Sequence, residues 1–218
     1  MLRNHTLFSA LAGLGLWLAS APASAVPLFS DNFDADTAGL NAPGGLINWT
    51  IDNGTVDVIQ SGGFGISCVG GTGRCLDMDG STGNGGRIVS KDIFELVPGA
   101  FYELTAMISG NQRNSAIDTF SMGVLDATTL NPFGSGSGPV AGADPFSLQT
   151  FGISLGAGGN VRLFFEDPGA DNIGYILDDV AFECIRGCDV AGVPEPGILA
   201  LLGIGLAGAG YASRRRRT

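Results

Sequence analysis

Glycine limits what this chain can fold into more than any other feature of its sequence. The chain has 36 glycines among 218 residues, and they follow no three-residue period. Glycine costs about 1 kcal/mol per position relative to alanine inside a helix, so long helices are disfavoured. The absence of a period excludes a collagen-like triple helix. A turn-rich β protein is the class that remains.

Apolar and polar residues alternate over several short stretches between the two ends of the chain. One face is formed by Tyr102, Leu104, Ala106 and Ile108, and another by Phe120, Met122 and Val124. A period of two is typical of half-buried strands. Eight to ten such strands, with no internal repeat of 20–50 residues, predict an all-β protein. We expect a single jelly-roll-like β-sandwich over residues 26–189.

Two further segments lead to specific expectations about the connections. Apolar residues alternate over 151–155 and again over 161–165, on either side of Gly156-Ala157-Gly158-Gly159, which predicts a hairpin. The stretch 132–145 is rich in glycine, serine and proline, which predicts a long irregular loop.

The first 25 residues have the three parts of a secretory signal peptide. Arg3 precedes an apolar stretch over 7–19, and the small residues Ala23 and Ala25 suit a signal peptidase that cuts before Val26. An N-terminal membrane anchor is the weaker alternative, because the apolar stretch is short. The only histidine, His5, lies in this segment. The mature protein therefore lacks histidine-based catalysis and histidine zinc ligands.

The last 29 residues, 190–218, form a second segment with its own organisation. Val193, Pro194, Glu195 and Pro196 precede an uncharged stretch over 197–213, which is followed by Arg214, Arg215, Arg216 and Arg217. As a helix, that stretch would be about 25 Å long, enough to span a bilayer core. The arginines favour a cytoplasmic C-terminus, which leaves the main domain outside. A plain tail anchor has the same physical pattern.

The order of these three parts resembles the PEP-CTERM sorting signal. This resemblance covers about 193–218 and rests on Pro194-Glu195-Pro196, the glycine-rich apolar segment and the terminal arginines. It implies bacteria that make exopolysaccharide, an inner-membrane intermediate, processing by an exosortase and release to the cell surface or matrix. It implies nothing about what the attached domain binds.

Four cysteines lie in the part expected to be exported into an oxidising compartment. They permit three pairings. We favour Cys68 with Cys75 and Cys184 with Cys188, because each pair encloses a short segment that contains glycine. A zinc ion held by all four thiolates is the alternative, although these spacings are unusual for zinc sites.

The formal net charge of −10 limits the possible partners and points to carboxylates as ligands. An acidic surface repels phosphate backbones, so we expect no nucleic-acid partner. In the predicted strand over 174–182, adjacent Asp178 and Asp179 face opposite sides, so one of them points toward the core. A buried carboxylate requires hydrogen bonds, an ion pair or a metal. Hydrogen bonds to loop amides, with a salt bridge to Arg87 or Arg162, would satisfy this requirement without a metal.

This strand and the segment 29–34 weakly resemble the closing and opening strands of galactose-binding-like domains and carbohydrate-binding modules with a jelly-roll fold. The resemblance implies a structural calcium ion near Asp31 or Asp34 and Asp178 or Asp179. No other cofactor is expected. The segment 77–84 spaces acidic residues as an EF-hand does, but Ile88 stands where the bidentate glutamate belongs. We expect Asp79 to organise a turn; a role as a calcium ligand is the weaker alternative.

Three classes of function remain open. The first is a noncatalytic module that binds exopolysaccharide, with Trp49, Tyr102 and Tyr175 as rings that could stack on sugars or else belong to the core. The second is a structural or adhesive matrix scaffold without a small ligand. The third is a glycosidase that uses two carboxylates, for which Glu95, Glu103, Glu166 and Glu183 show no distinguishing setting. We favour the first class and expect no enzymatic activity.

Overall fold

The computed structural model describes residues 25–169 and 171–188, together with Ile204. Positions 1–24 of the predicted signal peptide lie outside the described residues, and so does the sorting tail except for Ile204. Within the described part, no helix is long and apolar enough to cross a membrane.

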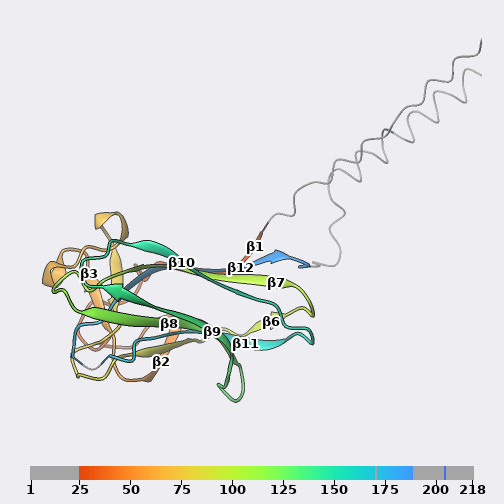
Figure 1. Ribbon diagram of the computed structural model, residues 1–218, viewed down its shortest axis with the longest axis horizontal. Helices are drawn as coiled ribbons and strands as arrows, with labels where there is room; N and C mark the ends of the chain where they lie inside the picture. Colours follow the sequence, from red (N-terminus) through yellow and green to blue (C-terminus); the bar gives the residue numbers. More distant parts are fainter. Residues whose placement is uncertain (1–24, 170, 189–203, 205–218) are drawn as a thin grey trace, which may run out of the picture.

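Twelve strands in the described part form two stacked antiparallel sheets (Figure 1). The strands are β1 (Val26–Asp31), β2 (Trp49–Asn53), β3 (Asp57–Gln60), β4 (Arg74–Asp77), β5 (Arg87–Ser90), β6 (Phe94–Leu96), β7 (Phe101–Ser109), β8 (Ile117–Asp126), β9 (Pro132–Ala141), β10 (Ser147–Ile153), β11 (Gly159–Glu166) and β12 (Ile176–Arg186). Two 3₁₀ turns, η1 (Gly63–Gly65) and η2 (Val69–Gly71), lie between β3 and β4. The predicted all-β sandwich is confirmed.

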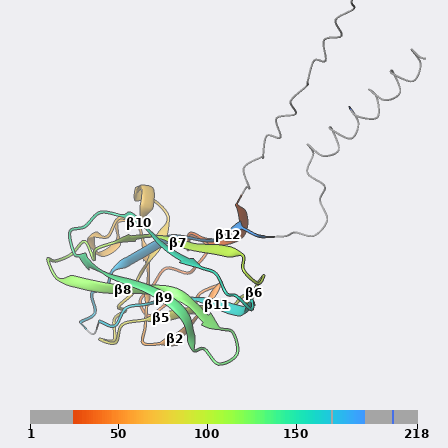
Figure 2. The same cartoon turned by 45° about the vertical axis from the view of Figure 1, so that its right-hand side comes forward.

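The order of the strands brings distant parts of the chain together. The first sheet runs β10-β7-β12-β4-β3, and β1 also pairs with β12. The second runs β2-β5-β11-β8-β9, and β6 also pairs with β11. The last strand therefore lies inside the first sheet, between β7 on one side and β1 and β4 on the other. Figure 2 shows β12 beside β7 from a second direction.

The core lies between the two sheets. The inward residues predicted from the alternation, Tyr102, Leu104, Ala106 and Ile108 on β7 and Phe120, Met122 and Val124 on β8, are buried. Both predicted faces are confirmed, because every second side chain of these strands points into the space between the sheets.

The predicted hairpin over 151–165 is wrong. Strand β10 pairs with β7 in the first sheet, and β11 pairs with β8 in the second. The glycine-rich segment between them therefore crosses from one sheet to the other. Turn residues indicate that the chain reverses, but they do not say which neighbour a strand will pair with.

The predicted irregular loop over 132–145 is also wrong for most of its length. Residues Pro132–Ala141 form β9, an edge strand that pairs with β8. A Cβ on Gly134 would lie 3.1 Å from the ring of Phe151, and one on Gly138 would lie 3.2 Å from the ring of Phe120. Rings from neighbouring strands fill the space that side chains of β9 would otherwise occupy. Proline is tolerated because the strand is at an edge.

The cysteines lie in the two pairs that the sequence favours. Cys68 and Cys75 are joined with their Cα atoms 5.5 Å apart, and Cys184 and Cys188 with theirs 5.9 Å apart. Because the sulfurs are bonded to one another, they are not available as four thiolates for a zinc ion.

Candidate functional site

Three loops enclose an open cleft with a volume of about 530 Å³. The first loop contains η2, the second joins β7 to β8, and the third joins β9 to β10. The residues used in the argument below are Gly70, Gly71, Gln112, Gly142, Asp144 and Phe146. Functional sites are commonly built from loops on a rigid scaffold of strands, and this cleft has that construction.

Gln112 fastens the second loop to the first. Its side-chain oxygen accepts a hydrogen bond from the Ser67 amide at 2.9 Å, and its side-chain nitrogen donates to the Ser67 carbonyl at 3.0 Å. Its own amide donates to the Gly142 carbonyl of the third loop at 2.8 Å. The backbone of Gln112 is left-handed, with φ of 58°. One residue thus links all three walls of the cleft.

Asp178 holds η2 in place from below. Its carboxylate accepts hydrogen bonds from the Val69 amide at 2.9 Å and the Asp179 amide at 2.8 Å. Burial raises the pKa of the Asp178 carboxyl to about 6, although both amides act in the opposite direction. The disulfide between Cys68 and Cys75 closes the same loop. The first wall is therefore fixed by a covalent bond and a buried carboxylate.

The cleft is lined by an aromatic ring, Phe146, and by a carboxylate two residues before it, Asp144. Phe146 is half-buried and packs against the small apolar cluster around Ile59 and Ile66. Asp144 is exposed, and its Oδ2 accepts a hydrogen bond from the Ala141 amide at 2.8 Å. A flat apolar face beside a few oriented polar groups is the usual composition of a small-molecule site.

The alternation predicted for the last strand breaks at Asp179. A bulge falls between Asp178 and Ala181 in the pairing of β12 with β7, and Asp179 has φ of 43°. Leu177 therefore lies in the main core, Asp178 is buried beneath η2, and Val180 returns to the main core. Asp178 accepts loop amides, as the metal-free interpretation predicts. Arg87 forms its ion pair with Asp52 instead, at 2.7 Å.

The four carboxylates considered as calcium ligands are not brought to one place. Asp34 accepts hydrogen bonds from the Arg74 amide at 2.7 Å and from Asn32 Nδ2 at 3.0 Å. Asp31 and Asp179 line the same surface hollow, whereas Asp178 lies beneath η2. Asp31 accepts hydrogen bonds from Trp49 Nε1 at 2.8 Å, Asn48 Nδ2 at 3.1 Å and the Phe33 amide at 2.9 Å. Calcium at this hollow stays a prediction, with Asp31 and Asp179 as the residues that face it.

The three rings considered for sugar stacking belong to the core. Trp49, Tyr102 and Tyr175 are exposed by 1%, 2% and 0%. Their polar atoms are satisfied internally: Trp49 donates to Asp31, Tyr102 Oη accepts from the Val97 amide at 2.8 Å, and Tyr175 donates to the Glu166 carbonyl at 3.4 Å. None of the three can stack on a sugar ring.

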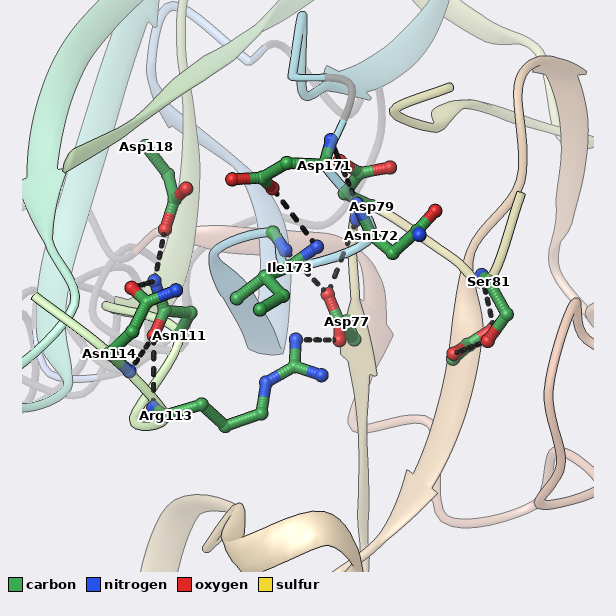
Figure 3. A network of polar contacts seen from close by, with 12 residues as sticks. Asp77, Asp79, Ser81, Asn111, Arg113, Asn114, Asp118, Asp171, Asn172 and Ile173 are labelled. Carbon is green, nitrogen blue, oxygen red and sulfur yellow. Dashed lines mark hydrogen bonds and ion pairs between the residues drawn. The ribbon is translucent and has the colours of Figure 1, made fainter. Parts of the chain in front are cut away.

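The second loop also takes part in a polar network, several of whose members are buried (Figure 3). Figure 3 shows Arg113 extending to Asp77, at the end of β4, with which it forms an ion pair. Burial raises the pKa of Asp77 to about 7, although Arg113 opposes this shift. Asn111 donates to Asp118 Oδ2 at 3.0 Å. The network ties the loop that carries Gln112 to β4 and β8.

Asp79 organises the chain near this network, but not the turn that the sequence suggests. Its Oδ2 accepts hydrogen bonds from the amides of Asp171 at 2.9 Å and Asn172 at 3.1 Å. These amides belong to the loop between β11 and β12, more than ninety residues away in the sequence. Asp79 therefore connects two distant loops.

Comparisons with known proteins agree with this geometry at the level of the fold. The xylan-binding domain CBM22-1 of Paenibacillus barcinonensis Xyn10C has 15% identity and a TM-score of 0.50, over 76% of this chain and all of that domain. A carbohydrate-binding module of Cellvibrio mixtus lichenase 5A, in complex with cellotriose, has 9% identity and a TM-score of 0.42, over 74% of this chain and 100% of that one. TmCBM61, in complex with β-1,4-galactotriose, has 12% identity and a TM-score of 0.41, over 66% of this chain and 92% of that one. No curated protein matches the sequence.

The C-terminal segment has a specific match. Residues 192–217 match the family model described as the PEP-CTERM protein-sorting motif. The chain therefore carries this sorting motif, as its sequence predicts, attached to a sandwich with the fold of a carbohydrate-binding module.

Sequence reasoning did not find the residues that form the cleft. The stretch 111–118 reads as a turn, and no local signal distinguishes Gln112, Asp144 or Phe146 from ordinary loop residues. They come together only because β7, β8, β9 and β10 end at the same side of the sandwich.

Proposed function

We propose that this chain is an exported, noncatalytic protein whose sandwich binds exopolysaccharide at the cell surface or in the biofilm matrix. The observation that carries the proposal is the cleft with Phe146 and Asp144, on a scaffold whose fold is shared with a xylan-binding domain. A phenyl ring can cover the apolar face of a sugar, and a carboxylate can accept bonds from its hydroxyls.

The chemistry of the cleft favours an uncharged polymer. Asp144 is an exposed carboxylate, and the whole chain has a formal net charge of −10. Uronic acids or sulfated sugars would meet like charges at this site. Neutral hexose or pentose chains are therefore the expected ligands.

The sorting motif gives the route by which the domain reaches this ligand. Signal peptidase would remove 1–25, and the segment 197–213 would hold an intermediate in the inner membrane. An exosortase would then recognise Pro194-Glu195-Pro196 and release the sandwich outside. The match of 192–217 to the sorting motif supports this order of events.

A matrix scaffold without a small ligand is the second candidate. It is favoured by the burial of Trp49, Tyr102 and Tyr175, because the three rings expected to stack on sugars are not at the surface. A glycosidase has less support. Glu103 and Glu183 face each other on β7 and β12, but they lie on the sheet and do not line the cleft.

Electrophoresis in gels that contain a neutral polysaccharide tests the proposal. Xylan, β-glucan and galactan gels should retard the chain if its cleft binds one of them. Phe146→Leu, which keeps an apolar contact but removes the flat ring, should abolish most of the retardation. Phe133→Leu is the matched control, because Phe133 is 45% exposed on β9 and does not line the cleft. Equal retardation of both variants would show that the polysaccharide binds away from Phe146. No retardation of the wild type in any gel would favour the scaffold.

A further inference from the structure

Two buried carboxylates outside the cleft each have an oxygen without a hydrogen-bond partner. Asp79 is 0% exposed and Asp167 is 2% exposed. Among the residues that the structure describes, no donor meets Asp79 Oδ1 or Asp167 Oδ2 within both the distance and the angle of a hydrogen bond, although the Tyr175 amide approaches the Asp167 carboxylate. The opposite oxygens are occupied: Asp79 Oδ2 accepts the amides of Asp171 and Asn172, and Asp167 Oδ1 accepts the Gly169 amide at 2.7 Å. A buried acceptor without a partner is costly, so these two oxygens require an explanation.

The two carboxylates lie close to the same two glycines. A Cβ on Gly169 would lie 2.9 Å from Asp167 Oδ1 and 3.3 Å from Asp79 Oδ2. A Cβ on Gly174 would lie 2.7 Å from Asp167 Oδ2 and 2.9 Å from Asp79 Cβ. Side chains are therefore excluded from the space between the carboxylates, which come from the β4–β5 loop and the β11–β12 loop.

The charge around these groups is not balanced by the described residues. Asp77 and Asp118 lie in the same network, and its cation, Arg113, is already paired with Asp77. Neither of the described ion pairs includes Asp79 or Asp167, so both carboxylates lie buried near other acidic side chains without a cation of their own.

We propose that Asp79 and Asp167 bind a calcium ion between them through Asp79 Oδ1 and Asp167 Oδ2. Calcium takes six to eight oxygen ligands in flexible geometry and accepts carboxylates, carbonyls and waters, whereas magnesium demands a near-ideal octahedron. Two buried carboxylates on separate loops suit the first ion better. The ion would join the β4–β5 loop to the β11–β12 loop, beside the segment that carries Gln112. This site is distinct from the hollow lined by Asp31 and Asp179.

Calorimetric titration of the full-length chain tests this site directly. The chain is purified in detergent, stripped with EGTA and titrated with CaCl₂ at pH 7.5. We expect calcium binding and a rise in Tm of about 5 °C or more at saturating calcium. Asp167→Asn should lose this binding and the rise in Tm. Asp31→Asn and Asp179→Asn should retain both, which distinguishes the two locations, and Asp92→Asn serves as an exposed control.

Thermal unfolding of each variant in EGTA shows whether a loss of calcium binding comes from a loss of folding. Asp167→Asn removes a buried negative charge near other carboxylates, so without calcium it should be at least as stable as the wild type. Asp79→Asn is the less safe variant, because Asp79 also holds the amides of Asp171 and Asn172. Unchanged calcium affinity in Asp167→Asn would overturn the proposal. Absence of calcium binding by the wild type would overturn it as well and would leave a shared proton as the explanation.

Discussion

Arg113, in the loop after β7, forms an ion pair with Asp77 at the end of β4, and this contact fixes the loop that carries Gln112. Asp77 is 1% exposed, so its charge depends on this guanidinium. This contact thus ties the second wall of the cleft to β4.

Removing this guanidinium should destabilise the fold more than removing one whose partner carboxylate is partly exposed. Arg113→Met leaves Asp77 buried without a cation, and we expect a loss of about 2–3 kcal/mol in the free energy of unfolding. Arg87→Met is the matched control: its partner Asp52 is more exposed, so the loss should be about 0–1 kcal/mol. Urea unfolding at pH 8 measures both. Equal losses would contradict the role given to Arg113.

Substitution by alanine should change the stability differently at two glycines of the β8–β9 pair. A Cβ on Gly123 would lie 2.2 Å from the Gly134 carbonyl oxygen, so Gly123→Ala must push β9 away and should cost about 1–3 kcal/mol. A Cβ on Gly136 would meet the ring of Phe151 at 3.6 Å, which is ordinary contact. Gly136→Ala should therefore change stability by less than about 0.5 kcal/mol. Thermal unfolding of both variants checks this, and a neutral Gly123→Ala would show that β9 does not pair as described.

Asp178 should make the protein less stable as the pH rises. Its pKa in the folded state is about 6, above the ordinary value of 3.8. Between pH 3.8 and 6 the folded state therefore binds the proton more tightly than the unfolded state does. The stabilising contribution is complete below about pH 4 and is lost as the pH rises through about 6, on the order of 3 kcal/mol.

The variant Asp178→Asn isolates this contribution. Asp77 and Asp167 shift in the same direction, so the wild type alone would report all three carboxyls. The difference in unfolding free energy between wild type and variant, measured from pH 4 to 8 in EGTA, should change through the same window. A difference that does not vary with pH would contradict the buried setting of Asp178.

The sorting motif makes a prediction about release. Glu195→Ala changes the centre of Pro194-Glu195-Pro196 without altering the apolar segment or the arginines. In a host with an exosortase, we expect the variant to stay in the membrane fraction while the wild type reaches the surface or medium. Cell fractionation and blotting measure the ratio. Release of the variant at the wild-type level would support a plain tail anchor cleaved by other means.

The sequence predicts strands well where side chains carry the signal. The alternation over β7 and β8 is visible because every second residue is apolar, and it locates their buried faces correctly. It misses β9, since glycines at Gly134, Gly136 and Gly138 leave the inward face to rings from other strands. The sequence does not predict the pairing partners of β10 and β11, because a glycine-rich segment can cross from one sheet to the other as well as close a hairpin.

The residues of the candidate site are harder to predict from the sequence than the fold is, for a related reason. Gly70, Gln112 and Phe146 lie on three loops that are far apart in the sequence, and only the pairing of the strands brings them together. The bulge at Asp179 likewise reverses the face of β12 without any change in the alternation of its residues.

Hydrogen exchange of the chain with and without a soluble oligosaccharide of the retained polymer tests the central claim most directly. The amides of Gly70, Gly71, Gly142, Ala143, Asp144 and Phe146 should gain protection when the sugar is present, since these residues line the proposed cleft. Protection confined to the outer face of the second sheet, around Val89 and Arg162, or no change at any saturating concentration, would contradict binding at this cleft.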